Sequence, residues 1–98
     1  MPIIETIEFT TTPDTTAAAL ESALRALDGE LTTLGGFLSR DLYRVDGADN
    51  TWLLDYKWTT LDDAQSSMSR VASTATFGAL MALVDSPETM RMVYGTPA

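Results

Sequence analysis

The centre of the chain, residues 37–58, has the sequence FLSRDLYRVDGADNTWLLDYKW. Its two ends, residues 37–45 and 51–58, are rich in aromatic and large aliphatic residues, which favours β-strands. The five residues between them are polar and include a glycine, so we expect the two strands to form an antiparallel hairpin. Alternate residues of a strand share one face, and on the second strand these are Trp52, Leu54, Tyr56 and Trp58.

The clearest periodic pattern lies before this hairpin. Leucines at positions 20, 24, 27, 31 and 34 recur every three or four residues, which places them on one stripe of an amphipathic helix. Thr12 or Asp14 can cap the start of this helix, and Gly35-Gly36 can end it in the left-handed conformation. Residues 3–11, which precede Pro13, are β-branched and aromatic and predict an opening strand.

A second helix and a last strand are expected after the hairpin. Thr60 and Asp63 resemble a capping box, so the helix should begin near Leu61. Low helix propensity at residues 73–76 predicts that it is kinked or broken there. Residues 90–94 predict the last strand. The order βαββαβ is typical of a ferredoxin-like α+β fold, with a four-stranded antiparallel sheet and two helices on one face.

Composition limits the chemistry. The 98 residues are expected to form a single domain, residues 1–98. The chain has no cysteine and no histidine, which removes the usual side chains for metal sites, haem ligation and acid–base catalysis, and we predict no metal site. With 14 acidic and 6 scattered basic residues, the net charge of -8 argues against nucleic acid or an anionic membrane as partner. We expect a cytoplasmic location, since no apolar run approaches the length of a membrane span.

The expected sheet has one face that no helix covers. In a chain of this size such a face would be an unusually large exposed patch. Packing two such sheets against each other would bury it. We therefore expect a homodimer formed through the sheet face.

The chain resembles the antibiotic-biosynthesis-monooxygenase-like branch of the dimeric α+β barrel superfamily. The resemblance covers nearly the whole chain. It is carried by Thr12-Pro13-Asp14 before the first helix, by Gly36-Phe37-Leu38 at the start of the second strand, and by Trp58 just before a capped helix. It implies a dimeric α+β barrel.

The resemblance also separates two activities of this superfamily. Haem-degrading members have an Asn on the first strand, a Trp at the end of the third and a His on the second helix. Only Trp58 matches, since Met68 stands near the His position and the first strand offers Glu5, Thr6 and Glu8. Haem degradation is therefore disfavoured. The chain resembles more closely the members that oxidise polyketide-like phenols and need no metal, flavin or other cofactor.

The aromatic face of the third strand is the candidate substrate pocket. If this face meets the helices, Trp58, Tyr56 and Trp52 line a space with Met68 and Phe77 that suits a flat aromatic ligand. Tyr56 is the preferred hydrogen-bond donor to such a ligand. The alternative is that all five side chains simply fill the core.

Two arginines and an aspartate each allow both a functional and a purely structural interpretation. Arg40 and Arg44 share a face of the second strand and are candidates to hold an ionised oxygen of the substrate. Alternatively, they pair with acidic residues or lie on the surface. Asp55 lies on the opposite face of its strand from Trp58, where an ion pair at the subunit interface is favoured over a catalytic base.

Two functions from different classes follow. The first is a small-molecule enzyme of the antibiotic-biosynthesis-monooxygenase type that oxidises an aromatic or polyketide-like substrate without a cofactor. Because the chain has no histidine, proton removal would fall to a carboxylate of raised pKa or to solvent. The second is a non-enzymatic ligand-binding or accessory homodimer, in which the same residues are plain core.

Overall fold

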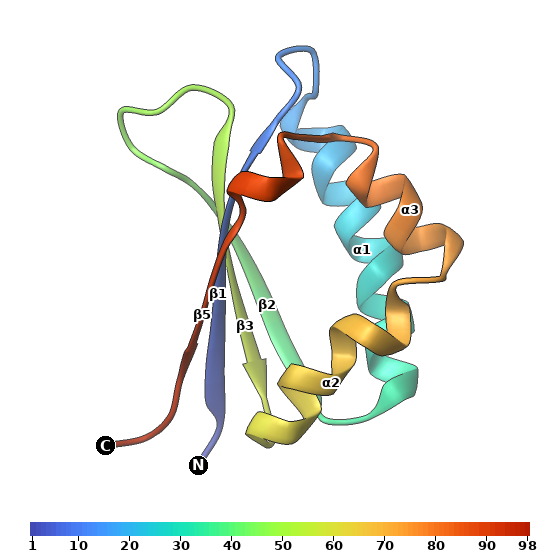
Figure 1. Cartoon of the computed structure of the whole chain (residues 1–98), viewed down its shortest axis with the longest axis vertical. Helices are drawn as coiled ribbons and strands as arrows, with labels where there is room; N and C mark the ends of the chain where they lie inside the picture. Colours follow the sequence, from blue (N-terminus) through green and yellow to red (C-terminus); the bar gives the residue numbers. More distant parts are fainter.

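The computed structural model describes residues 1–98 and confirms the order of elements expected from the sequence (Figure 1). The strands are β1 (Ile3–Thr11), β2 (Phe37–Arg44), β3 (Thr51–Trp58), β4 (Val84–Asp85) and β5 (Arg91–Gly95). The helices are α1 (Ala17–Leu34), α2 (Leu61–Val71) and α3 (Ala75–Met81), and a single 3-10 turn, η1 (Pro87–Thr89), precedes β5.

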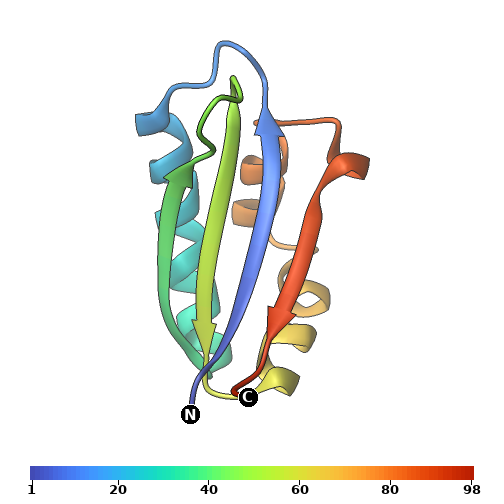
Figure 2. The ribbon, with the colours of Figure 1, turned by 90° about the vertical axis from the view of Figure 1, so that its left-hand side faces the viewer.

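The strands form one antiparallel sheet in the order β2-β3-β1, with β4 and β5 both pairing with β1. The four predicted strands are all present, and β4 adds a fifth that the sequence analysis did not predict. Its two residues are too few to show alternation. Figure 2 looks onto the uncovered face of the sheet, with α1 behind β2 and β3, and with α2 and α3 behind β1 and β5. The ferredoxin-like arrangement, with helices on one face only, is thus confirmed.

The leucine stripe of α1 faces the sheet, as its spacing predicts. Leu20, Leu24, Leu27 and Leu31 are all buried. The helix is capped by Thr16, whose side chain accepts a hydrogen bond from the backbone N–H of Ala19 at 3.0 Å. The predicted caps were wrong, because Thr12 Oγ1 instead lies 2.6 Å from Thr15 Oγ1, in the turn before the helix. Gly35 ends the helix with a positive φ of +89°, as expected, but its ψ of 152° differs from that of the left-handed conformation.

The predicted break in the second helical region is confirmed, and threonine caps explain it. Thr60 caps α2 by accepting a hydrogen bond from the N–H of Asp63 at 3.1 Å. Thr74 does the same for α3, accepting from the N–H of Phe77 at 3.2 Å. A residue that caps a helix has extended backbone angles, so the chain cannot continue helically through Thr74. None of the helices combines the length and apolar character that crossing a bilayer requires.

One core lies between the sheet and the helices, and it fixes which face of β3 is buried. Fifteen buried apolar residues form a single cluster, and they include Trp52, Leu54, Tyr56 and Trp58. The aromatic face of β3 therefore meets the helices. Asp55 and Lys57 are on the uncovered face.

Candidate functional site

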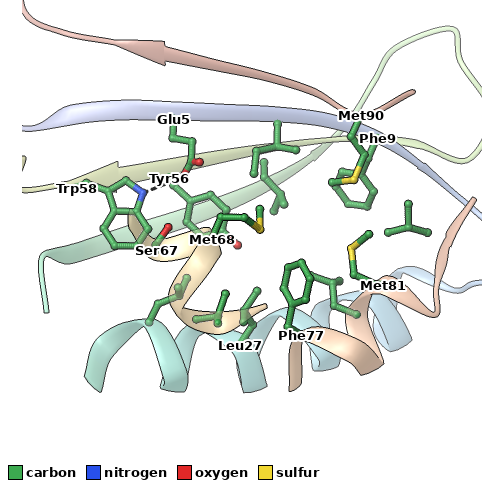
Figure 3. Close-up of a pocket in the computed structure, with 16 residues that line it drawn as sticks. Glu5, Phe9, Leu27, Tyr56, Trp58, Ser67, Met68, Phe77, Met81 and Met90 are labelled. Carbon is green, nitrogen blue, oxygen red and sulfur yellow. Dashed lines mark hydrogen bonds between the residues drawn. The ribbon is translucent and has the colours of Figure 1, made fainter. Parts of the chain in front are cut away.

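An apolar cavity of about 50 Å³ lies within this core (Figure 3). Sixteen residues line it, of which fourteen are hydrophobic, and they come from β1, β3, β4, all three helices and Met90. Three methionines, Met68, Met81 and Met90, are in the lining. Methionine side chains are unbranched and adapt their shape to what they contact. The boundary of the cavity is therefore deformable on the side of α2, α3 and the segment before β5.

Glu5 brings a carboxyl group into this apolar space. It lies on β1 between Ile3 and Ile7, on the face that meets the helices, and only 3% of its surface is exposed. Trp58 Nε1 donates a hydrogen bond to Glu5 Oε1 at 3.0 Å, drawn as a dashed line in Figure 3. Burial raises the pKa of Glu5, and hydrogen bonding from Trp58 and Tyr94 opposes this shift. A buried carboxyl group of raised pKa is the kind of group that takes part in proton transfer at functional sites, which makes Glu5 a candidate site residue.

Tyr56 lies directly opposite Glu5 in the pairing of β1 with β3. It is 4% exposed and lines the cavity. Burial, together with the negative charge of Asp28, raises the pKa of the Tyr56 phenol, while Arg40 opposes the shift. The phenol therefore keeps its proton at neutral pH and remains a hydrogen-bond donor. Phe37 packs edge-on against the Tyr56 ring, with centroids 6.1 Å apart, which restricts its orientation.

Four of the seven predicted pocket residues are brought together. Trp58, Tyr56, Met68 and Phe77 all line the cavity. Trp52 does not, although it is buried on the same face of β3. It lies six residues from Trp58, which corresponds to about 20 Å along a strand. Its Nε1 donates to Thr11 Oγ1 at 3.0 Å, so its polar group is used within the core.

The two arginines lie outside the cavity lining, and the structure gives each another partner. Arg40 Nη1 lies 2.8 Å from Glu21 Oε2, and Arg40 Nη2 lies 2.7 Å from Asp28 Oδ2. Hydrogen bonding to Glu21 is the main cause that raises the pKa of Arg40. The guanidinium of Arg44 lies 4.5 Å from the centroid of the Trp52 ring, in a cation–π contact. The alternative interpretation, in which Arg40 pairs with acidic residues, is therefore the one that the geometry supports.

Glu5 was not selected as a site residue from the sequence, although a signal was present. Ile3, Ile7 and Phe9 occupy the odd positions of β1, so a charged residue at position 5 interrupts an apolar face. A charge on a buried face needs a partner, and here it is Trp58, 53 residues away. No group of three or more acidic side chains is placed to hold a metal ion.

Comparisons with known proteins identify solved structures of the same fold. The structure superimposes on SnoaB, a cofactor-independent oxygenase from Streptomyces nogalater, with a TM-score of 0.75 and 21% identity, covering 99% of this chain and 93% of that one. It also matches a candidate antibiotic biosynthesis monooxygenase from Bordetella bronchiseptica, with a TM-score of 0.81, 14% identity and coverage of 99% and 97%. A similar candidate from Nitrosomonas europaea gives a TM-score of 0.72 at 14% identity, with coverage of 97% and 89%.

No family model matches the sequence, and no curated protein matches it significantly. At identities of 14–21% the structural matches concern the backbone arrangement over nearly the full length of each chain. They confirm the expected resemblance at the level of fold. This chain therefore has the ferredoxin-like α+β fold shared by SnoaB and the candidate antibiotic biosynthesis monooxygenases.

Proposed function

We propose that this protein is a small-molecule enzyme that oxidises an aromatic or polyketide-like substrate without a cofactor. The observation that carries the proposal is the Glu5 carboxyl group, fixed by Trp58 in an otherwise apolar cavity. A core needs no carboxylate, and burying one costs free energy that hydrogen bonding, here from Trp58, only partly offsets. A base in an apolar site is suited to removing a proton from a weakly acidic substrate. Because the chain has no histidine, the enzyme proposal calls for a carboxylate of raised pKa as the base, and Glu5 is such a group.

The reaction balances with molecular oxygen as the only co-reactant. Glu5 takes a proton from an activated methylene group of the substrate, and the resulting carbanion reduces oxygen. Two C–H bonds and the O–O bond break, a C=O bond forms, and the second oxygen atom leaves as water. The substrate supplies all four electrons. Glu5 can return its proton to the leaving oxygen, so the carboxylate is regenerated. The oxygenase activity of SnoaB, which has the same fold, supports this assignment.

The size of the cavity favours a second candidate, a non-enzymatic ligand-binding or accessory protein. A water molecule needs about 10–15 Å³ of cavity volume, so a cavity of 50 Å³ holds only a few water molecules. An aromatic ring enters only if the lining moves. The enzyme proposal therefore requires that Met68, Met81 and Met90 rearrange when a ligand binds. The second candidate requires no such rearrangement.

A homodimer through the uncovered sheet face is the second part of the proposal. Ile4, Tyr43 and Val93 are large and exposed, and strand alternation places them on the same face as Asp55. Asp55 Oδ2 lies 3.2 Å from Lys57 Nζ, but Asp55 Oδ1 is enclosed and has no hydrogen-bond partner. A second copy would cover the apolar side chains and supply a donor to Oδ1.

A cytoplasmic location also remains a prediction.

Oxygen uptake with anthrone as the trial substrate tests the enzyme proposal. We expect the wild-type protein to consume oxygen and form anthraquinone faster than the uncatalysed reaction does. Glu5→Gln keeps an oxygen that can accept from Trp58 but removes the base, so it should lower the rate at least tenfold. Glu30→Gln, on α1 outside the cavity lining, is the matched control and should keep the wild-type rate. A rate that is equal in wild type and Glu5→Gln would contradict the proposal.

A further inference from the structure

Glu5 and Tyr56 place two groups of opposite hydrogen-bonding character in the same cavity. They are directly opposite each other on β1 and β3, and both line the cavity. Side chains at such positions begin about 5 Å apart. An ionised carboxylate only accepts hydrogen bonds and has capacity for about four, so hydrogen bonding from Trp58 and Tyr94 still leaves sites on Glu5 for a ligand. A protonated phenol can donate.

The Tyr56 hydroxyl has no hydrogen-bond partner in the chain. It is not fully enclosed, in contrast to Asp55 Oδ1, the one enclosed side-chain oxygen without a partner. Figure 3 shows the Tyr56 ring among the cavity residues, between Trp58 and Met68. A buried tyrosine hydroxyl usually has a partner. The free donor is therefore available to an acceptor atom of a bound molecule.

The cavity contains no positive charge to balance an anion. No Lys or Arg side chain lines it. Arg40, the nearest candidate on the neighbouring strand β2, is already paired with Glu21 and Asp28. A second negative charge next to Glu5 would be unfavourable in an apolar space. The site should therefore discriminate against anionic ligands.

We propose that the cavity selects a neutral aromatic molecule that carries both an acidic hydrogen, which Glu5 accepts, and a carbonyl oxygen, to which Tyr56 donates. This inference rests on the proposed function, because it requires the cavity to open for a ligand. It makes Tyr56 a specificity-determining residue. It also replaces the expectation that an arginine holds an ionised oxygen of the substrate.

Three single-ring probes of similar size test the inference by calorimetric titration at pH 7. 4-Hydroxyacetophenone carries a hydroxyl and a carbonyl group, 4-ethylphenol lacks the carbonyl, and 4-hydroxybenzoate is an anion. We expect the wild-type protein to bind them in that order of decreasing affinity. In Tyr56→Phe the affinity for 4-hydroxyacetophenone should fall about three- to tenfold, to the level of 4-ethylphenol, whose affinity should not change. In Glu5→Gln the affinity for 4-hydroxybenzoate should rise about tenfold.

Tyr43→Phe is the matched control, since Tyr43 is an exposed tyrosine on the uncovered face of the sheet. It should leave all three affinities unchanged. Suppose that the wild type binds 4-hydroxyacetophenone and 4-ethylphenol, but Tyr56→Phe lowers the two affinities equally or changes neither of them. This inference is then overturned, while the proposed function stands. The same holds if the wild type binds the anion as tightly as 4-hydroxyacetophenone. If no probe binds the wild type, the proposed function itself fails, and the inference fails with it.

Discussion

Trp58 and Glu5 meet diagonally across two antiparallel strands. Glu5 is the direct partner of Tyr56 on β3, and Trp58 is the next inward-facing residue along that strand. The 3.0 Å hydrogen bond from Trp58 Nε1 to Glu5 Oε1 therefore lies within the plane of packing between sheet and helices, where water is scarce. A hydrogen bond to a charged acceptor in such surroundings is strong, and it fixes the orientation of the carboxyl group.

Replacing Glu5 by Gln should stabilise the fold at neutral pH. The pKa of Glu5 is raised in the folded state, so the protonated form favours folding, and this contribution is lost as the pH rises through the folded-state pKa. Gln does not titrate and keeps an acceptor for Trp58. The difference in free energy of unfolding between variant and wild type should be near zero below pH 4. As the pH rises further, the difference should grow and then level off at about 1.4 kcal/mol for each unit by which folding raises the pKa of Glu5.

Urea denaturation from pH 3.5 to 8 measures this difference. Glu30→Gln, which replaces a residue of α1 outside the cavity, should show no such rise with pH. If Glu5→Gln is less stable than wild type at pH 7 and equally stable at pH 3.5, the carboxylate stabilises the fold. The argument that Glu5 is retained for chemistry would then be wrong.

The Arg40 cluster should contribute to stability and not to ligand binding. The side chain of Arg40 is 5% exposed, and it joins β2 to Glu21 and Asp28 of α1. Because both carboxylates are partly exposed, we expect Arg40→Met to cost about 1–3 kcal/mol at pH 7, less than the loss of a fully buried pair. Hydrogen bonding from Arg40 lowers the pKa of Glu21, so this stability is present above the ordinary pKa and is lost as the pH falls through the lowered one.

Thermal unfolding of Arg40→Met at pH 7 and pH 3 checks both statements. Arg25→Met is the control, since the Arg25 side chain is 77% exposed and its distance to Glu21 is 3.7 Å. It should change stability by less than about 0.5 kcal/mol. A loss of affinity for 4-hydroxyacetophenone in Arg40→Met, beyond that explained by unfolding, would instead support the role that the sequence suggested for Arg40.

Most of the fold could be predicted from the sequence because its patterns are local. The leucine spacing of α1 and the alternation of β3 each lie within one element. The site was harder to predict, because it depends on pairs that are distant in sequence. Arg40 is matched with Glu21 and Asp28 only when β2 lies against α1, and Glu5 meets Trp58 only through strand pairing. Trp52 shares a face with Trp58, but a shared face does not show how far along it the cavity extends.

Association through the uncovered sheet face should depend on its apolar side chains. Val93 is 54% exposed on β5, which pairs only with β1. Val93→Glu would place a charge in the interface of the proposed dimer, and we expect it to shift sedimentation from dimer to monomer at micromolar concentration. Ala26→Glu, at an exposed position of α1, is the control and should remain dimeric. A wild-type protein that sediments as a monomer would contradict the proposed homodimer.

Trp58 separates the function of the site from the packing of the core. It is 1% exposed, so Trp58→Ala should cost roughly 3–5 kcal/mol whatever the protein does. Trp58→Phe is more informative, because it keeps an aromatic ring and most of the side-chain volume while it removes the donor to Glu5. We expect the free energy of unfolding to fall by about 1–3 kcal/mol. The pKa of Glu5 should rise further, because a hydrogen bond that lowers it is gone.

The control for Trp58→Phe is Trp52→Phe. The Trp52 indole also donates one hydrogen bond of 3.0 Å, to Thr11, but it lies outside the cavity. Trp58→Phe should therefore destabilise the fold at least as much as Trp52→Phe does, because the acceptor of Trp58 is a carboxyl group and that of Trp52 is a neutral hydroxyl. If the cavity is an active site, only Trp58→Phe should shift the pH dependence of oxygen uptake to higher pH, because a base of raised pKa ionises later. Equal effects of both substitutions on oxygen uptake, in proportion to the loss of stability, would show that Trp58 acts through packing alone.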